Sequence, residues 1–483
     1  MSARGASVPV LEATDFWQAE WLANRFDHRF LYDLDAKLWH VYDPETGLWR
    51  IDSRNVIREI VPMLVRETFA QHESGERELK TDGQRKALLA LYNNEPVRRA
   101  LDSLGTITGY KIGTDEWDQH PHLLGTASGV VDLRTGEVVK PERARDLHLS
   151  MSTGVPYTPG LTPRRFLEHM ELVQPDPVRR AYLLRTFGYM LTGETGEQLW
   201  WFWYGPKAAN GKSQTADIVR LSLGEYGANV PPALFTRDKF KKAIDVGSSL
   251  HALRSVRMGD MAELSHVAEL DSELLKRMVE GAAAGIPYRP PYGGRDLMAR
   301  PPTKLIGHGN SRPEVTDSNN GFWRRVRVVP WDQVVPEDRR IRDFGMKLVA
   351  EEGEAILSLL VREAVAYYAN GLLPEPGDVA EATNEYRATA DHFALWLNDD
   401  VLVTGLPRDT HSSSDAWTAY DRWCDAQGIR TSQRLDGKEF KARLEGVTGV
   451  TWKKTNKGNV FVGVQLPGRQ QPPHLTLIDG EAA

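Results

Sequence analysis

An unbroken hydrophobic run, LWWFWY, occupies residues 199–204. A strand with one face in water alternates apolar and polar residues, whereas a run without polar interruptions is typical of a strand buried on both faces of a parallel sheet. The run is followed by the glycine-bracketed segment 205–211 and then by TADIVRL, which is compatible with a helix. The pattern therefore predicts a buried strand, a tight loop and a helix in direct succession.

Other stretches have weaker patterns. Residues 37–52 alternate around an Asp-Pro-Glu-Thr-Gly turn, which predicts a hairpin. Helical spacing of apolar residues predicts helices over 56–72, 84–104 and 164–191. Residues 123–139 predict two short strands joined by Arg-Thr-Gly. The chain ahead of the hydrophobic run is therefore expected to mix helices with short strands.

Three further elements follow the glycine-bracketed loop. Alternating residues ahead of Asp260 and Glu263 predict a strand that ends with acidic residues. A second strand is expected to end at Asn310, and a third to be headed by Arg324 and Arg325. This is the order expected of a P-loop ATPase with an acidic pair, a polar sensor and an arginine that acts on a neighbouring subunit.

The loop itself has a chemical interpretation. Gly205, Gly211, Lys212 and Ser213 fit the pattern G-x-x-x-x-G-K-[ST]. The glycines permit close backbone approach to phosphates, the helix offers the positive end of its dipole, Lys212 reaches the β and γ phosphates, and Ser213 supplies a hydroxyl to Mg²⁺. The alternative is a chance match, against which the flanking strand and helix argue. The predicted ATP-binding residues are Gly205, Pro206, Lys207, Ala208, Ala209, Asn210, Gly211, Lys212, Ser213 and Gln214.

Composition narrows the class of protein. The chain has 483 residues, enough for two to four domains, with 41% hydrophobic and 26% charged residues and no apolar run of membrane-spanning length. No membrane partner is therefore expected. Cys424 is the single cysteine, which excludes a disulfide framework. The net charge of −6 means that nucleic-acid binding would depend on local basic patches.

Taken together, the motifs resemble those of a known family. The chain is similar to the C-terminal helicase part of phage and plasmid primase-helicases, within superfamily 3 of the AAA+ ATPases, and to the poxvirus replicative primase-helicase. The segments that carry the resemblance are LLGTASGVVDLRTGEVV, TFGYMLTGETGEQLWWFWYGPKAANGKSQTADIV, GDMAELSHVAELDSELLKRMVEG, HGNSRPEVTDSNNGFWRRVRVVPW, VAEATNEYRATADHFALWLND and WTAYDRWCDAQGI. Each motif is weak alone, and their shared order makes the match specific.

The resemblance implies a fold class and a domain organisation. The expected fold is α/β, with an AAA+ P-loop ATPase core, an α+β N-terminal region and a C-terminal winged-helix domain. The expected boundaries are 1–160, 161–375 and 376–468, followed by a tail at 469–483. The chain begins at what resembles the family's linker region, so priming is expected to come from a separate primase.

It also implies roles for single residues. Glu263 would polarise the attacking water, Asp260 would help to hold the metal, and Asn310 would be the sensor. Either Arg324 or Arg325 would reach the γ-phosphate bound to the neighbouring subunit. Simpler interpretations are solvated turn carboxylates for the acidic pair, a turn-initiating asparagine and a surface salt-bridging arginine pair.

DNA contacts are expected at two places. The first is a hairpin region with Lys276, Arg277, Arg289 and Arg295, although the chain reads EGAAAGIPYR where the family has a Gly-Gly-Asp run. The second is a turn between two C-terminal strands, the wing of the expected winged helix. Its basic residues are Lys453, Lys454 and Lys457. The alternatives are solvated charged surfaces at the first place and packing against a protein at the second.

The sequence thus favours an ATP-dependent DNA helicase or translocase of phage or mobile-element replication. The resemblance implies a homo-oligomeric ring, a hexamer, that acts on single-stranded and forked DNA in the cytoplasm of a prokaryotic host. The alternatives are an origin-binding initiator or loader that uses ATP as an assembly switch, and a defence-associated ATPase. The basic hairpin favours the helicase over the initiator or loader, because an assembly switch does not need to hold DNA while moving along it.

Overall fold

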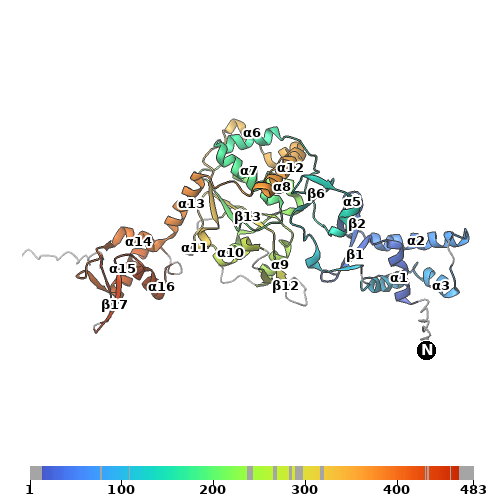
Figure 1. Ribbon diagram of the computed structural model, residues 1–483, viewed down its shortest axis with the longest axis horizontal. Coiled ribbons are helices and arrows are strands. Elements are labelled where there is room, and N and C mark those ends of the chain that lie inside the picture. The colour runs from blue at the N-terminus through green and yellow to red at the C-terminus, as the bar shows by residue number, and fades with distance from the viewer. Residues whose placement is uncertain are drawn as a thin grey trace, which may run out of the picture.

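A computed structural model describes most of the chain (Figure 1). The helices and strands lie in three parts along the long axis, with the N-terminal part at one end, a parallel sheet in the middle and the C-terminal part at the other end. No helix among the described residues is long and apolar enough to cross a membrane. The described residues are 14–76, 79–107, 109–236, 243–264, 269–281, 285–288, 297–315, 320–429, 431, 434–456 and 458–466.

The N-terminal part packs helices against a small sheet of order β3-β2-β1-β4. The predicted hairpin is confirmed, because β2 and β3 pair antiparallel. The predicted helix over 84–104 is two helices, interrupted at 91–93. The bounds are α1 Asp15–Phe26, β1 Phe30–Asp33, β2 Leu38–Asp43, β3 Leu48–Ile51, α2 Val56–Glu73, α3 Asp82–Ala90, α4 Asn94–Leu104 and β4 Lys111–Ile112.

A three-stranded antiparallel sheet, in the order β5-β6-β7, follows. Its strands are β5 Leu123–Thr126, β6 Gly129–Asp132 and β7 Glu137–Val139, after which comes the short helix α5 Pro141–Ala144. The sequence predicted two strands here. The Arg-Thr-Gly turn does join β6 to β7, but a second turn at 127–128 divides the first predicted strand.

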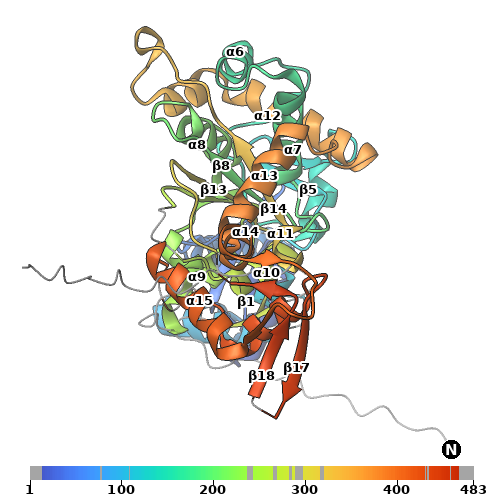
Figure 2. The same cartoon turned by 90° about the vertical axis from the view of Figure 1, so that its left-hand side faces the viewer.

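The middle part is built on a five-stranded sheet of order β14-β8-β13-β10-β9, in which all neighbours are parallel. Helices α6, α7, α8 and α12 cover one face, and α9, α10, α11 and α13 cover the other (Figures 1 and 2). The predicted parallel sheet flanked by helices is therefore confirmed. The strands are β8 Trp200–Tyr204, β9 Gly227–Asn229, β10 Met258–Met261, β13 Lys304–Gly309 and β14 Val326–Pro330.

The hydrophobic run forms β8, the strand between β13 and β14. Trp201 and Trp203 belong to the hydrophobic core on one face of the sheet, and Trp200 and Phe202 to the core on the other face. All four side chains are essentially inaccessible to solvent. The absence of polar alternation is thus explained by burial on both faces.

The helices of the middle part differ from the sequence expectation at one point. The predicted helix over 164–191 is two helices, α6 and α7, because Pro175 lacks the N–H of a helix interior and Asp176 caps the second helix by accepting a hydrogen bond from the Arg179 N–H. The helices are α6 Arg164–Val173, α7 Pro177–Leu191, α8 Lys212–Leu223, α9 Ala243–Ala252, α10 Ser272–Glu280, α11 Asn320–Trp323, α12 Phe344–Asn370 and α13 Gly377–Ala390.

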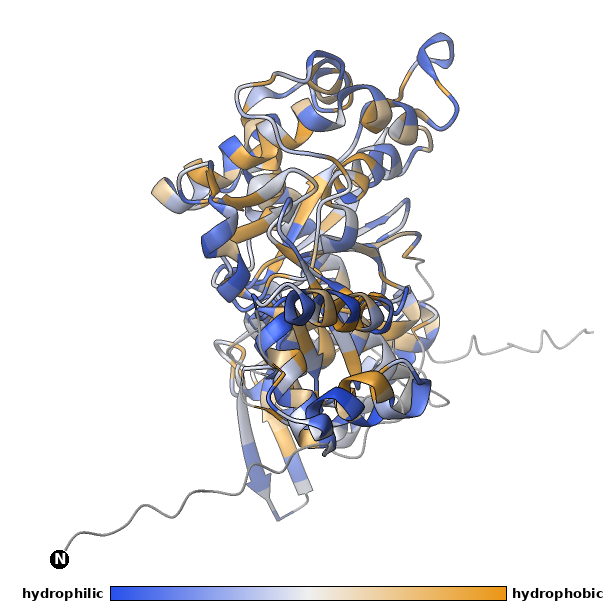
Figure 3. Ribbon diagram, turned by 90° about the vertical axis from the view of Figure 1, so that its right-hand side faces the viewer, coloured by the Kyte–Doolittle hydropathy of each residue, from blue (hydrophilic) through white to orange (hydrophobic). Residues whose placement is uncertain are grey.

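The C-terminal part has its own core of aromatic residues, with Trp396, Tyr420, Phe440 and Phe461 buried at its centre. Its helices pack on a sheet of order β16-β18-β17 and a short pair of strands, β15 and β19. Helices in all parts show bands of hydrophobic and hydrophilic residues, as amphipathic helices with one buried face do (Figure 3). The bounds are α14 His392–Asp400, β15 Leu402–Val403, β16 Thr410–Ser412, α15 Ser413–Ala426, α16 Gly437–Glu445, β17 Thr451–Thr455, β18 Gly458–Val462 and β19 Val464–Gln465.

Two buried cations tie the amino-terminal edge of the central sheet to its surroundings. Arg257, just before β10, donates hydrogen bonds to the carbonyl oxygens of Leu191 and Leu123 at 2.5 and 2.6 Å. Lys304, the first residue of β13, donates to the carbonyl of Thr192. Burial holds the pKa of Lys304 well below its usual value. These bonds link the sheet to the chain on both sides of α7.

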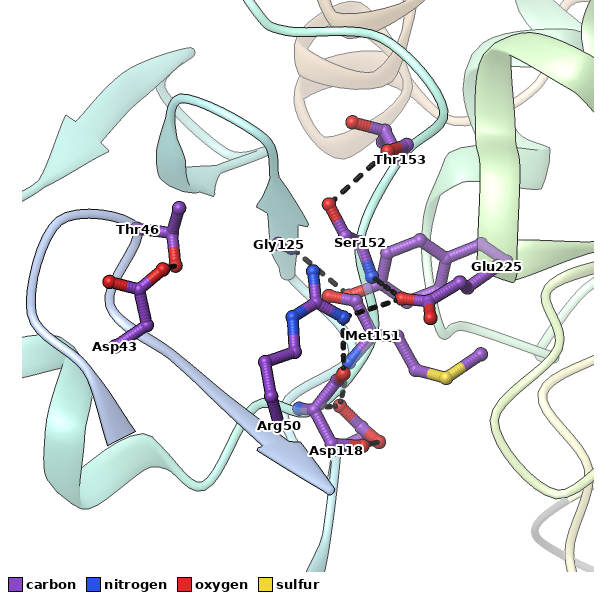
Figure 4. A network of polar contacts seen from close by, with 11 residues as sticks. Asp43, Thr46, Arg50, Asp118, Gly125, Met151, Ser152, Thr153 and Glu225 are labelled. Atoms are coloured by element: carbon purple, nitrogen blue, oxygen red, sulfur yellow. Dashed lines mark hydrogen bonds and ion pairs between the residues drawn. The ribbon is translucent and has the colours of Figure 1, made fainter. Parts of the chain in front are cut away.

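A polar network joins the N-terminal part to the end of α8 (Figure 4). Arg50 of β3 forms an ion pair with Glu225 at 2.7 Å, and the same carboxylate accepts the Ser152 N–H at 2.7 Å. The hydroxyl of Tyr226 accepts the Gly125 N–H at 3.0 Å. Glu225 and Tyr226 lie in the turn that directly follows α8, so the N-terminal part contacts the far end of that helix.

Helices α7 and α12 are in close contact at Gly188, so a larger residue at this position is expected to destabilise the protein. A Cβ atom on Gly188 would lie 2.5 Å from the Glu363 carbonyl carbon and 2.6 Å from the Ala364 nitrogen. Backbone atoms of a packed helix yield little, so Gly188→Ala should lower the free energy of unfolding by about 1–3 kcal/mol. Thermal and urea unfolding would measure it. Gly377→Ala is the control, because a Cβ there meets nothing within 4 Å, and equal stability of the two variants would contradict the packing.

Candidate functional site

The loop between β8 and α8 has two positions that only glycine fits. A Cβ on Gly205 would lie 2.1 Å from the Asn210 side-chain nitrogen and 2.4 Å from the Trp331 carbonyl oxygen. Gly211 has φ +83°, and its Cβ would lie 2.5 Å from Val173 of α6. The loop is therefore closely packed from both sides, and its conformation depends on both glycines.

Lys212, the first residue of α8, lies at the centre of the site. Its Nζ donates hydrogen bonds to the Gly205 carbonyl at 3.1 Å, to Asn210 Oδ1 at 2.9 Å and to Asn310 Oδ1 at 3.0 Å. The side chain is buried, and burial lowers the pKa of Lys212 to about 8. All three partners are neutral, and in the described part of the chain no carboxylate lies within 4.0 Å of this nitrogen. The site thus holds a cation without a counter-charge.

Parallel pairing brings Lys212 and Asn310 together. Gly309 at the end of β13 pairs with Tyr204 at the end of β8, so the residues that follow the two strands meet at the carboxyl edge of the sheet. Asn310, the predicted sensor, is exposed there. Ser213, the predicted metal ligand, is also exposed, in the first turn of α8.

The two acidic candidates occupy different environments. Asp260 is buried inside the sheet, and its Oδ1 lies 3.0 Å from His308 Nε2 without the geometry of a hydrogen bond. The register aligns Asp260 with Ile306, and Ile306 with Trp201, three residues before the end of β8 and about 10 Å along the strand. Glu263 is exposed beyond the end of β10, with φ +61°.

The two arginine candidates also differ. Arg325 is buried, forms an ion pair with Glu280 and donates to Gln198 Oε1 at 3.3 Å. Arg324 is exposed. Both precede β14, whose first residue, Val326, pairs with the first residue of β8. They therefore lie at the edge of the sheet opposite to the loop between β8 and α8.

The DNA-contact candidates are only partly described. Lys276 forms an ion pair with Glu273 at 2.5 Å, and Arg277 is exposed on α10. Strands β11 Ile286–Tyr288 and β12 Leu297–Ala299 pair antiparallel, in agreement with the expected hairpin. The positions of Arg289, Arg295 and Lys457 lie outside the described residues.

The C-terminal lysines require one correction. The sequence placed Lys453 and Lys454 on a turn between two strands. Both instead belong to β17 itself, which pairs with β18, and both are exposed. Strand β17 is longer than expected because its residues pair with β18 as far as Thr455, which pairs with Gly458.

A pocket of about 410 Å³ opens beside the loop between β8 and α8. Its walls are α6, the loop, and the segment 335–344 that leads into α12. Sequence reasoning missed the lining residues on α6 and in the segment 335–344, since no motif marks them and they are distant from the loop along the chain. The lining residues are Arg165, Glu168, His169, Leu172, Ala209, Gly211, Gln214, Val335, Arg339, Arg340, Ile341 and Phe344.

The N-terminal third of the chain matches a known family, and longer stretches are similar to viral proteins. Residues 19–174 match the family described as D5 N terminal like. Protein 184R of Invertebrate iridescent virus 6 is 22% identical over 382 residues, covering 72% of this chain and 39% of its own length. Protein L207/L206 of Acanthamoeba polyphaga mimivirus is 22% identical over 328 residues, covering 63% of this chain and 33% of its own length. Both names carry the word helicase.

The chain resembles the primase-helicase family. It spans between about a third and two fifths of the length of these viral relatives. The apo structure of the NrS-1 C-terminal region, residues 305–718, aligns with 93% of this chain and all of that chain, at a TM-score of 0.46 and 11% identity.

The pKa of Lys212 predicts how nucleotide binding depends on pH. In the free protein Lys212 loses its proton as the pH rises through about 8, and a bound phosphate would raise its pKa again. Binding above pH 8 should therefore take up a proton, and the affinity for ATP should fall by about tenfold for each pH unit. Calorimetry at pH 7, 8 and 9 in two buffers measures both quantities. In Lys212→Met the pH dependence should vanish, and a constant wild-type affinity from pH 7 to 9 would refute the assignment.

Proposed function

We propose that this chain is an ATP-dependent DNA helicase or translocase that serves the replication of a phage or another mobile element. The observation that carries the proposal is the Lys212 ammonium, which lies between the phosphate-binding loop and Asn310 with neutral partners only. A buried cation without a counter-charge is suited to an anionic ligand. The helicase names of the viral relatives supply the reaction class.

The phosphates of ATP bind over the loop, where backbone N–H groups and the start of α8 favour negative charge. Lys212 then exchanges its neutral partners for phosphate oxygens, and Asn310 is released to orient the γ-phosphate. The 410 Å³ pocket beside Gly211 receives the nucleoside. Ser213, exposed in the first turn of α8, and Glu263 would hold Mg²⁺, which would neutralise charge on the phosphates.

Glu263 is the residue that polarises the attacking water. It lies beyond the end of β10 on the same edge as the loop, whereas Asp260 is buried within the sheet beside His308. Asp260 consequently does not contact the metal. It supports the carboxyl edge of the sheet from within, beside His308. Catalysis in this arrangement is mostly positioning of water and stabilisation of charge on the γ-phosphate.

Arg324 is the arginine finger, and Arg325 supports the fold. Arg325 is occupied by Glu280 in its own subunit, but Arg324 is exposed. The five-residue strand β8 separates both arginines from their own loop by about 17 Å, so Arg324 acts on the nucleotide of a neighbour. This requires a ring, for which we propose a hexamer.

The same proposal assigns the three parts of the chain. Because α13 packs on β14, residues 161–390 form an AAA+ core, 1–160 a preceding α+β domain, and α14 onward to residue 468 a winged helix whose exposed Lys453 and Lys454 contact DNA phosphates. The partners are single-stranded and forked DNA, in the cytoplasm of a prokaryotic host. Three helices around a small antiparallel sheet support the winged-helix assignment.

The first test is hydrolysis coupled to strand displacement. The wild-type protein should hydrolyse ATP and unwind a forked DNA, and Lys212→Ala should lower ATPase activity by about 100-fold or more, because the charge on the phosphates is lost. Lys207→Ala is the matched control, since Lys207 is exposed in the same loop. Circular dichroism would verify that both variants fold. Hydrolysis without displacement would favour the initiator or loader, and absence of hydrolysis would end the proposal.

The second test concerns the shared site. Arg324→Ala should bind ATP and assemble, yet hydrolyse about 10³-fold more slowly. Arg325→Ala should instead lower the melting temperature, because it leaves Glu280 without its partner. Mixing Arg324→Ala with Lys212→Ala rebuilds intact sites at some boundaries, and ATPase activity should partly recover. Mixed rings without recovery would contradict action in trans.

A further inference from the structure

His169 links α6 to the end of the phosphate-binding loop. Its Nε2 lies 2.8 Å from the hydroxyl oxygen of Thr215, in the first turns of α8, and both side chains are buried. The Thr215 hydroxyl also contacts the Gly211 carbonyl oxygen at 3.0 Å. A continuous hydrogen-bonded path therefore runs from α6 to Gly211.

The direction of these hydrogen bonds follows from counting protons. A hydroxyl has a single proton, and the Gly211 carbonyl can only accept, so Thr215 donates to Gly211. Thr215 must then accept from His169, whose proton is on Nε2. Burial lowers the pKa of His169 to about 4, which leaves the imidazole neutral at physiological pH.

Gly211 is the residue that this path restrains. It adopts φ +83°, a conformation that it leaves easily because glycine has few steric limits. Val173 and His169, one turn apart on α6, pack directly against it. The orientation of Gly211 determines where the loop amides point and where Lys212 begins α8. A restraint on Gly211 is therefore a restraint on the phosphate site.

We infer that His169 is a positioning residue for phosphate binding, whose Nε2–H fixes the Gly211 turn through the Thr215 hydroxyl. This inference rests on the proposed function, because it assigns a role within the same nucleotide site. His169 itself also lines the 410 Å³ pocket, where its ring stands 5.0 Å from that of Phe344. The side chain thus supports the loop on one side and forms a wall of the pocket on the other.

A double-mutant cycle on nucleotide affinity tests the inference. ADP binding is measured by calorimetry for the full chain, His169→Leu, Thr215→Val and the double variant. Each single substitution should weaken ADP binding by about 5- to 20-fold, because a buried hydrogen bond is lost. The double variant should be no weaker than either single one, since both remove the same path. His169→Gln, whose amide can donate to Thr215, should bind ADP within about threefold of wild type.

Steady-state kinetics separates positioning from general support of the fold. The KM for ATP should rise in His169→Leu and return in His169→Gln, while kcat changes less. A fall in melting temperature with unchanged ADP affinity would overturn the inference and leave the proposed function intact. Additive effects in the double variant would also overturn it.

Two further outcomes are informative. If His169→Leu fails to fold, Thr215→Val reports on the same contact, because valine keeps the shape of threonine without its hydroxyl, and unchanged ADP affinity in that variant refutes the path. If the wild-type chain binds neither ADP nor ATP, the proposed function fails, and the inference fails with it.

Discussion

Burial of β8 on both faces is the constraint on which the rest of the site depends. A strand without a polar face is stable only inside a sheet that is covered by helices on both sides. Its neighbours are then β13 and β14, and all three strands run in the same direction. The segments that follow β8 and β13 must therefore emerge next to each other, and Lys212 meets Asn310 as a direct consequence.

The electrostatics of the site follow from that placement. Lys212 is surrounded by oxygens that carry partial charges but no net charge, so burial costs the ammonium more than its hydrogen bonds return, and its pKa falls to about 8. Arg325, by contrast, is buried with Glu280 beside it. Arg257 and Lys304 are also buried with carbonyl partners, so Lys212 is distinguished by its position beside the loop rather than by its neutral partners alone.

The sequence predicted those elements whose structure depends mainly on neighbouring residues. The run at 199–204, the glycine loop and the hairpin at 37–52 each contain their own signal, as does the strand before Asn310. Tertiary contacts decided the rest. Arg325 is buried beside Glu280, whereas Arg324 is exposed. Glu280 is distant in sequence, so no local pattern predicts which of the two arginines it binds.

The same reason explains why the pocket escaped sequence reasoning. His169 reads as one polar residue on an amphipathic helix, and its role appears only when α6 lies against Gly211. The division of 164–191 into two helices was foreseeable from Pro175. Pairing with β13 sets the register of β10, which buries Asp260 within the sheet and leaves Glu263 beyond the end of the strand. No sequence pattern predicts that register.

Helix α8 connects the loop to the polar network in Figure 4. Its first residue is Lys212, and the turn after its last residue is fastened to the N-terminal part through Glu225 and Tyr226. A helix of 12 residues is a stiff rod about 18 Å long. In the proposed function, a shift of the loop when phosphate binds or leaves would move α8 and so reach β3, the strand that carries Arg50. Nucleotide binding and the position of the N-terminal part would then be coupled through this one helix.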